Sequence, residues 1–256
     1  MSRIFISGSS TGLGLMAAEH LQQLGHQVVL HARTTARADD ARLALPTAEA
    51  VVVGDLETLA GCRDVAAQVN ALGRFDAVIH NAAVGYQEAL RLTEDGLPHV
   101  FAVNTLSSYL LTALIARPAR LVYLSSGMHH HVDAHLDDLL WQRRRWNAAT
   151  AYAETKLHDA MLAFAIARRW PQVVATALEP GWVPTRMGGA GAPDDLHKAH
   201  LTQAWLATSH DAAAQASGRY FRYQRQMAAN PQAHDPALQD RLLARLQDIS
   251  GVALPG

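Results

Sequence analysis

The stretch Ser7-Gly8-Ser9-Ser10-Thr11-Gly12-Leu13-Gly14 decides how this chain folds. It follows a short apolar run, Ile4-Phe5-Ile6, and leads into a segment of helical character that ends at Leu24. Glycines between a strand and a helix permit a tight turn, and the free N–H groups at the helix start attract an anion. The spacing G-x-x-x-G-x-G differs from the G-x-G-x-x-G fingerprint of dinucleotide sites. The stretch therefore predicts a pyrophosphate-binding loop or, as the alternative, a glycine-rich turn without a ligand.

Length and composition indicate a single well-packed domain. The chain has 256 residues, of which 49% are hydrophobic and 18% are charged, and this suits one α/β domain with a full core. The net charge of −1 argues against nucleic acid or an anionic membrane as the main partner. We interpret the basic cluster Arg143-Arg144-Arg145 as a solvated helix edge or loop rather than a nucleic-acid site.

The single cysteine and the N-terminus indicate where the protein resides. Cys62 has no second cysteine with which to form an internal disulfide, which fits a reducing compartment. Met1-Ser2-Arg3 runs straight into a predicted strand and leaves no room for a signal peptide. No apolar run approaches the roughly 18 residues that span a bilayer. We therefore expect a soluble cytoplasmic protein.

Short apolar runs alternate with longer helical patterns along the chain. The runs are nearly continuous in apolar residues, as expected for parallel strands covered on both faces. The alternation predicts right-handed βαβ crossovers and a doubly wound Rossmann-type α/β/α sandwich, with a mostly or wholly parallel sheet of about seven strands. We expect one domain over residues 1–256. The predicted strands are Arg3–Ser7, Gln27–His31, Ala50–Val53, Asp76–His80, Arg120–Ser125, Val173–Glu179 and Gly218–Arg222, and the predicted helices are Gly12–Leu24, Thr35–Ala44, Leu56–Leu72, Glu94–Ala116, Thr150–Trp170, Ala192–Ser209 and Pro236–Leu246.

Polar residues follow several predicted strands, at the sheet edge where open parallel sheets bind ligands. Arg33 stands where NAD-selective dehydrogenases usually carry an acid, and positions 31–34 contain no acid. An arginine there suits the 2′-phosphate of NADP, and the alternative is an ordinary exposed arginine. Asp55 is a candidate acceptor for the adenine amino group or a helix N-cap. Asn81, in Asn81-Ala82-Ala83, is expected to bridge neighbouring loops or to form a plain turn.

Tyr152 and Lys156 are four residues apart in a predicted helix, so they lie on one face. A tyrosine with an ordinary pKa near 10 needs a shift of about 3 units, or about 4 kcal/mol, to exchange a proton near pH 7. An ammonium about 4 Å away supplies about 4 kcal/mol at an effective dielectric constant near 20. We therefore expect Lys156 to lower the pKa of Tyr152. Ser125-Ser126-Gly127, after the fifth strand, offers a hydroxyl to hold a substrate oxygen.

These motifs resemble those of the short-chain dehydrogenase/reductase family. The pattern is similar to the branch of the retinol dehydrogenases and protochlorophyllide reductases, for which Asp137-Asp138-Leu139 and the tail around Ala204-Trp205 are typical. The matching pieces lie in the family's order between residue 3 and about residue 190. They are Gly8-x-x-x-Gly12-x-Gly14, Asp55-Leu56, Asn81-Ala82-Ala83, Asn104, Ser126, Tyr152-x-x-x-Lys156 and Pro180-Gly181-Trp182-Val183-Pro184-Thr185.

The resemblance implies a role for each of these residues. Tyr152 would be the general acid/base, and Lys156 would lower its pKa and bind the nicotinamide ribose. Ser126 would orient the substrate carbonyl, with Ser125 as the second choice, and Asn104 would hold a water of the proton relay. The cofactor would contact Gly8, Ser10, Thr11, Gly12, Leu13, Gly14, Arg33, Asp55, Leu56, Asn81, Ala82, Ala83, Tyr152, Lys156, Val183 and Thr185.

The function implied by the resemblance is the interconversion of an alcohol and an aldehyde or ketone. NADP(H) is the expected cofactor and NAD(H) the alternative, with a small-molecule substrate. Two other functions stay open: NADPH-dependent reduction of an activated C=C bond, and a non-catalytic NADP-sensing regulatory protein. The C=C reductases of this branch typically use several cysteines, whereas this chain has only Cys62. A sensor would need only the nucleotide loop.

Two segments, 128–149 and 188–209, are expected to shape the substrate pocket. Ser126 lies 26 residues before Tyr152, a longer gap than in many family members, so the extra segment Met128–Ala149 is expected to form a flap over the pocket. His129-His130-His131 is expected to line the entrance. A metal site is not expected there, because consecutive residues rarely aim three rings at one ion.

The predicted helix that carries Tyr152 is apolar on more than one side, whereas a single core face needs a narrower stripe. We therefore expect a homodimer or homotetramer that pairs through this helix or, as the alternative, a helix buried within one chain. Trp141, Trp146 and Trp182 are expected to form an apolar wall of the pocket or part of the core. The apolar residues of the helix are Ala153, Leu157, Ala160, Met161, Ala163, Phe164, Ala165 and Ala167.

Overall fold

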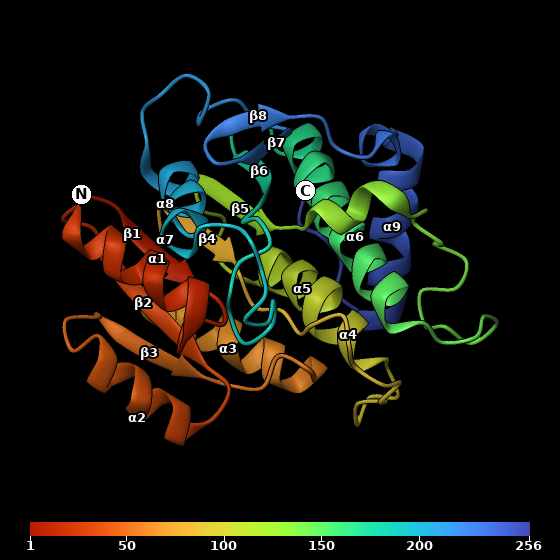
Figure 1. Ribbon diagram of the computed structural model, residues 1–256, viewed down its shortest axis with the longest axis horizontal. Helices are drawn as coiled ribbons and strands as arrows, with labels where there is room; N and C mark the ends of the chain where they lie inside the picture. Colours follow the sequence, from red (N-terminus) through yellow and green to blue (C-terminus); the bar gives the residue numbers. More distant parts are fainter.

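The computed structural model describes residues 1–256, which form a three-layer α/β/α sandwich (Figure 1). The sheet has 8 strands in the order β3-β2-β1-β4-β5-β6-β7-β8. All neighbouring strands are parallel except β8, which runs antiparallel to β7. The prediction of a Rossmann-type fold with a mostly parallel sheet is therefore confirmed. The strands are β1 (Arg3–Ile6), β2 (Gln27–Ala32), β3 (Ala50–Val53), β4 (Ala77–His80), β5 (Arg120–Leu124), β6 (Val174–Glu179), β7 (Arg219–Arg222) and β8 (Arg225–Met227).

Strand β8 is the one strand that was not predicted from the sequence. It is a three-residue edge strand of exposed residues, so it has no apolar alternation that could mark it. The turn before it consists of Tyr223 and Gln224, with φ values of 49° and 61°. Positive φ at both positions is typical of a two-residue hairpin turn, but such turns usually contain glycine or asparagine.

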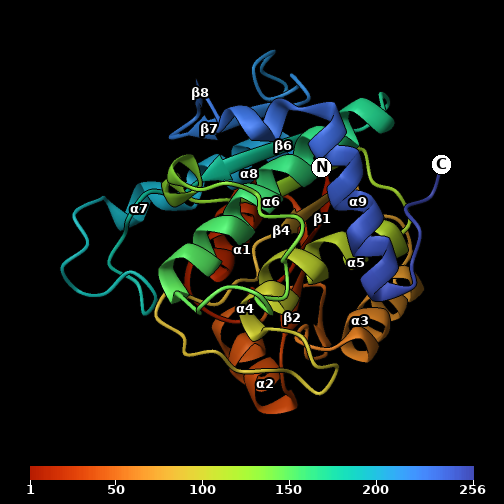
Figure 2. The same ribbon diagram turned by 90° about the vertical axis from the view of Figure 1, so that its right-hand side faces the viewer.

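Helices cover both faces of the sheet (Figures 1 and 2). One core cluster joins α1 (Gly12–Gln23), α2 (Thr35–Ala44) and α8 (Leu201–Thr208) to one face. A larger cluster joins α3 (Leu59–Ala71), α5 (Ser107–Leu114) and α6 (Ala148–Arg169) to the other face. The remaining helices are α4 (His99–Phe101), α7 (Leu196–Ala199) and α9 (Pro236–Ser250), with short 3-10 segments at η2 (Gly127–His131) and η3 (Pro231–His234). None of these helices is both long and apolar enough to cross a membrane.

Four predicted helices differ from the structure, and one of them, α9, extends four residues beyond its predicted end at Leu246. The predicted helix 94–116 is divided into α4, a π-helical segment η1 (Ala102–Leu106) and α5. The predicted helix 192–209 is divided into α7 and α8 at His200. Helix α3 begins three residues later than predicted, because the Thr58 hydroxyl accepts a hydrogen bond from Gly61 N at 2.9 Å and makes Thr58 the N-cap. The alternative role of Asp55 as a helix cap is therefore wrong.

Helix α6 is covered within a single chain. Its side away from the sheet packs against η3 and α9, which lies beside it in Figure 1. Leu157, Ala160 and Met161 have no exposed surface, and Phe164 is 5% exposed. The alternative explanation, a helix buried within one chain, therefore accounts for its apolar pattern. A homodimer or homotetramer stays a prediction, to be checked by light scattering.

Candidate active site

The glycine loop after β1 has no room for side chains at two of its glycines. Gly8 has a φ of +63°, and a Cβ built on it would lie 2.6 Å from Ala82 Cα. A Cβ on Gly14 would lie 2.5 Å from Asn81 Nδ2. Thr11 is the N-cap of α1 but makes no side-chain capping bond. The first N–H groups of this helix therefore stay available to an anion, and this loop has the form of a phosphate cradle.

The other residues of the glycine loop, from Ser10 to Leu13, are at least partly accessible to solvent. Thr11 and Gly12 are exposed, while Ser10 and Leu13 are half-buried. Gly12 has a φ of +62°, and no atom lies within 4 Å of a Cβ built on it. Glycine is therefore favoured at this position by the backbone conformation and not by close packing. All loop residues predicted to contact the cofactor thus lie around the start of α1.

Asn81 bridges the loops that follow β4 and β1. Its side-chain Nδ2 donates to Ser7 O at 3.0 Å and to Gly8 O at 2.9 Å. The Ser7 hydroxyl in turn accepts from the backbone N–H groups of Asn81 and Ala82, both at 3.1 Å. The bridging interpretation of Asn81 is confirmed. Ala82 and Ala83 follow it as small, half-buried residues beside the glycine loop.

His31 also holds the glycine loop, and the sequence analysis did not recognise it. The Gly8 N–H donates to His31 Nδ1 at 2.9 Å, so the proton lies on Nε2, which donates to Gly54 O at 2.9 Å. Burial lowers the pKa of His31, with hydrogen bonding to Gly54 acting in the opposite direction. A neutral imidazole thus joins the ends of β2 and β3 to the loop. A histidine at the end of an otherwise apolar strand is the signal that was available.

Arg33 and Asp55 lie at the ends of neighbouring strands, as the parallel topology requires. The Arg33 side chain is 63% exposed, and its Nε is 4.0 Å from Asp55 Oδ2. An exposed pair at this distance is weak, so Arg33 stays free to meet a ligand phosphate. The Leu56 side chain is buried in the core, so it faces away from this exposed pair.

Ser126, Tyr152 and Lys156 meet where β5 ends beside α6. The Ser126 hydroxyl faces the Tyr152 side chain, and it accepts from Met128 N at 3.3 Å as the N-cap of η2. The Ser125 hydroxyl donates to Lys156 O at 2.7 Å instead. This difference favours Ser126 over Ser125 as the hydroxyl that faces a substrate.

The pKa of Tyr152 does not follow the direction expected from the sequence. Burial raises the pKa of Tyr152, while the Lys156 charge and the nearby Ser126 hydroxyl lower it without outweighing burial. Lys156 Nζ lies 5.8 Å from the centre of the Tyr152 ring. The expected dominance of Lys156 is therefore not seen, because the tyrosine is mostly buried, with 7% of its surface exposed, and the ammonium is engaged by two other groups.

The Lys156 ammonium is held by two hydrogen bonds. Its Nζ donates to Leu124 O at 2.7 Å and to Asp159 Oδ2 at 2.8 Å. Both side chains of this ion pair are almost fully buried. Asp159 was not predicted as a site residue. Its position three residues after Lys156 places it on the same helical face, and this spacing was the available signal.

Asn104 lies in the π-helical segment η1 and has no exposed surface. Its Oδ1 accepts from Val84 N at 2.8 Å, and its Nδ2 donates to Val84 O and Thr155 Oγ1, both at 3.1 Å. Asn104 therefore ties the loop after β4 to the helix that carries Tyr152. Single π-helical turns occur frequently at functional sites.

His129 forms a hydrogen bond with the backbone of Ser126. Its Nδ1 donates to Ser126 O at 2.7 Å, and its Nε2 accepts from Asn230 N at 3.1 Å. Burial lowers the pKa of His129 to about 4. His130 and His131 are exposed and line an open depression of about 360 Å³ together with Asn230. Because both ring nitrogens of His129 are engaged, the three histidines do not converge on one ion.

The loop after β6 carries Val183 and Thr185. Val183 is buried, and the Thr185 hydroxyl accepts from Gly188 N at 3.1 Å. This loop reaches the loop after β4, because a Cβ built on Gly85 would lie 3.1 Å from Met187 Cγ. Trp182 is 54% exposed, so it is not part of the core. It offers an apolar surface at the edge of this loop.

Arg144 fixes the segment Met128–Ala149 to α6. Its guanidinium donates to both Glu154 oxygens, at 2.5 and 3.0 Å, and to Asp138 Oδ2 at 3.1 Å. It also lies 4.0 Å over the Trp141 ring. The segment is therefore an anchored wall beside the first turns of α6 rather than a loosely attached flap. The interpretation of 143–145 as a loop is confirmed, with Arg143 and Arg145 exposed.

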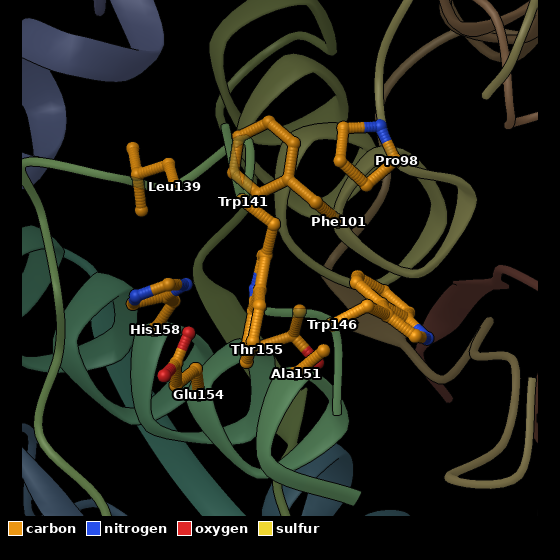
Figure 3. A pocket seen from close by; sticks show the side chains of 9 residues that line it. All are labelled: Pro98, Phe101, Leu139, Trp141, Trp146, Ala151, Glu154, Thr155 and His158. Carbon is orange, nitrogen blue, oxygen red and sulfur yellow. The ribbon is translucent and has the colours of Figure 1, made fainter. Parts of the chain in front are cut away.

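A small cavity lies between this wall and α6 (Figure 3). Its volume is about 10 Å³, which is room for about one water molecule. Trp141 and Trp146 pack edge to face on one side of it. It does not include Tyr152 or Ser126, so it is not the catalytic cleft. Its lining residues are Pro98, Phe101, Leu139, Trp141, Trp146, Ala151, Glu154, Thr155 and His158.

Comparison with known proteins places the chain in a family. Residues 2–128 match the family model described as short chain dehydrogenase. The chain is 43% identical to an uncharacterized oxidoreductase of Emericella nidulans over 100% of both chains. It is 30% identical to human retinol dehydrogenase 13, over 98% of this chain and 85% of that protein.

Solved structures show the same fold at low sequence identity. An uncharacterized protein from Mycobacterium paratuberculosis matches 100% of this chain and 96% of its own, with a TM-score of 0.87 and 22% identity. A blue fluorescent protein from a metagenomic library, solved in complex with NADPH, matches 86% of this chain and 95% of its own, with a TM-score of 0.70 and 16% identity.

The chain belongs to the short-chain dehydrogenase/reductase family and is an oxidoreductase that uses a nicotinamide cofactor. Within the family it belongs to the branch that includes the retinol dehydrogenases.

Proposed function

We propose that this enzyme interconverts an alcohol and an aldehyde or ketone with NADP(H), and that Tyr152 is its general acid/base. The observation that carries the proposal is the meeting of Ser126, Tyr152 and Lys156 at the end of β5. Carbonyl reduction requires a hydrogen-bond donor to the substrate oxygen, a proton donor and a nearby positive charge. This hydroxyl, phenol and ammonium can supply these three functions.

Each residue of the candidate site is proposed to have a separate role in the reaction. The bound nicotinamide would supply or accept the hydride at the carbon of the substrate. Ser126 donates a hydrogen bond to the substrate oxygen, and Tyr152 gives that oxygen a proton during reduction or takes it during oxidation. Lys156 uses two of its three N–H donors within the protein, which leaves one for the ribose. Asn104 is proposed to hold the water through which Tyr152 regains its proton.

The proposed preference for NADP(H) rests on Arg33 and on the absence of an acid at positions 31–34. The Arg33 side chain is exposed beside the loop, and two proteins of the same fold have been solved with NADPH or NADP. Because a hydrogen bond to a charged group contributes about 1.5–3 kcal/mol, Arg33→Ala is expected to lower kcat/KM for NADPH about 10- to 100-fold. The value for NADH should change little. Arg37→Ala, which removes a neighbouring exposed arginine, is the control.

The function is tested by NADPH oxidation against a panel of aldehydes, ketones and quinones. Turnover of at least one carbonyl compound, with the alcohol as product, is the expected result. Tight NADPH binding without turnover of any compound would instead favour the sensing protein, and a saturated C–C product would favour the C=C reductase. Segments 128–149 and 188–209 are proposed to select the substrate. The exposed Trp182 donates to Gly188 O of the second segment at 2.9 Å, so exchanging Trp182 should change KM among the active compounds.

A further inference from the structure

We infer that Asp159 is a positioning residue of this active site: its buried carboxylate fixes the direction of the Lys156 ammonium and offsets part of the positive charge that Tyr152 experiences. The inference rests on the proposed function for its catalytic consequence. The pairing itself is a property of the protein that can be measured without any substrate.

The contact is short and enclosed. Asp159 Oδ2 accepts from Lys156 Nζ at 2.8 Å, and Asp159 is 2% exposed. The other carboxylate oxygen, Oδ1, receives no hydrogen bond. The Ser108 hydroxyl faces the carboxylate from α5, but it donates to Asn104 O at 3.1 Å. Lys156 is therefore the only strong partner of a carboxylate that is otherwise costly to bury.

The groups around Asp159 define what its charge can influence. Lys156 and Tyr152 face it from α6, and Tyr123 faces it from β5. His80, on β4, packs against Tyr123 in a tilted arrangement with ring centres 4.6 Å apart. Burial raises the pKa of Asp159 to about 6, although Lys156 lowers it. An ionised Asp159 raises the pKa of Tyr152 as well, so its charge opposes that of Lys156 at the phenol.

The two hydrogen bonds of Lys156 also fix the orientation of its ammonium group. With one N–H directed to Leu124 O and one to Asp159 Oδ2, the orientation of the third is determined. Protonation or removal of the carboxylate would release one of the two anchors and leave the ammonium less neutralised. The phenol of Tyr152 would then lose its proton more easily.

The pairing is tested directly by lysine-selective isotope labelling, because the chain has only two lysines, Lys156 and Lys198. The side-chain NMR resonances are assigned with Lys198→Arg and followed from about pH 8 to about pH 5.5. We expect a transition with a midpoint near 6 in the Lys156 resonance of the wild type, caused by protonation of Asp159. The transition should be absent in Asp159→Asn, which keeps the size of the side chain and removes its charge.

A matched control removes a different carboxylate that pairs with the same helix. Asp240 binds Arg168 and Arg169 near the end of α6 and is far from Tyr152 in sequence and exposed to solvent. Asp240→Asn should keep the Lys156 transition. The inference is overturned if the wild type shows no transition, or if Asp159→Asn still shows it. The wild-type result stands even if Asp159→Asn folds poorly.

The catalytic consequence is tested by the pH profile of kcat/KM for alcohol oxidation. In Asp159→Asn the apparent pKa of the catalytic base should fall by about 1 unit, and in Asp240→Asn it should not move. An unchanged profile in Asp159→Asn would overturn the charge-offsetting role. Tyr152→Phe is measured in parallel: if it keeps full activity, the proposed function fails while the NMR test of the pairing is unaffected.

Discussion

The glycine loop after β1 and the Tyr152 region of α6 lie at the same edge of the sheet, yet they are built differently. The loop is held by neutral groups: Gly8, Asn81 and the uncharged imidazole of His31 exchange hydrogen bonds there. The Tyr152 region contains a buried ion pair, Lys156 with Asp159, and Lys156 Nζ lies 5.8 Å from the centre of the Tyr152 ring.

This difference predicts different sensitivities. In the glycine loop, backbone atoms of neighbouring segments lie at contact distance, so there is no room for an added methyl group. A substitution that adds one should weaken cofactor binding at every pH. A site that depends on buried charge should respond to pH and to isosteric changes of charge. We therefore expect the glycine loop to determine whether the cofactor fits and the Tyr152 region to determine when a proton moves.

The largest expected effect is acid destabilisation of the catalytic half. His80, His129 and His158 are buried there, and burial lowers the pKa to about 3 for His80 and about 4 for the other two. Their folded pKa values lie below the unfolded value near 6.5, so stability is full above pH 6.5 and is lost as the pH falls toward 4. At pH 5 each histidine should remove about 2 kcal/mol from the free energy of unfolding.

Asp159 changes the free energy of unfolding at acid pH in the opposite direction to the three histidines, and its effect is smaller. Its folded pKa is raised to about 6, so its protonation below that value should return about 1 kcal/mol at pH 5. Calorimetry at pH 7 and pH 5 should therefore show a markedly lower Tm at pH 5. Hydrogen exchange should show α6 and η2 opening first. A Tm that does not change between these pH values would contradict the assignment of these histidines as neutral and buried.

The next largest effect is expected for Gly14→Ala at the nucleotide end. The added Cβ would meet Asn81 Nδ2 at 2.5 Å and Gly8 O at 2.7 Å, so the loop must move. Affinity for NADPH, measured by calorimetric titration, should fall about 100-fold or more. The control is Gly25→Ala, where φ is +84° and no atom lies near the new Cβ. It should cost about 1 kcal/mol of stability and leave the affinity intact.

The smallest of these effects is expected for His31→Leu. The change leaves Gly8 N–H and Gly54 O without their partner, which should cost about 1–3 kcal/mol of stability and weaken NADPH binding about 10-fold. His26→Leu is the matched control, because His26 Nδ1 also accepts a backbone N–H, from Ser2 at 3.0 Å. Equal loss of NADPH affinity in both variants would show that His31 has no special role at the loop.

Most of the fold could be predicted from the sequence because it rests on patterns of several residues. Continuous apolar runs marked the parallel strands to within a residue or two, whereas the exposed three-residue strand β8 had no such run. The breaks in the predicted helices 94–116 and 192–209 are not marked by any change in helical periodicity.

The site could be predicted where chemistry is concentrated in a motif. Ser126, Tyr152 and Lys156 are brought together as expected. His31, Asp159 and the supporting role of His129 were missed because no motif marks the groups that these side chains bind. The direction of the Tyr152 pKa was also misjudged, since spacing reveals the approach of Lys156 but neither the burial of the phenol nor the second partner of the ammonium.

The central claim is that Tyr152 transfers the proton while the cofactor is held elsewhere. The most direct measurement compares NADPH affinity and turnover in Tyr152→Phe, which removes one hydroxyl and keeps the ring. The proposed mechanism predicts that turnover falls about 10²- to 10⁴-fold while NADPH affinity stays within about threefold of the wild type. Turnover within a few-fold of the wild type, at unchanged affinity, would contradict it.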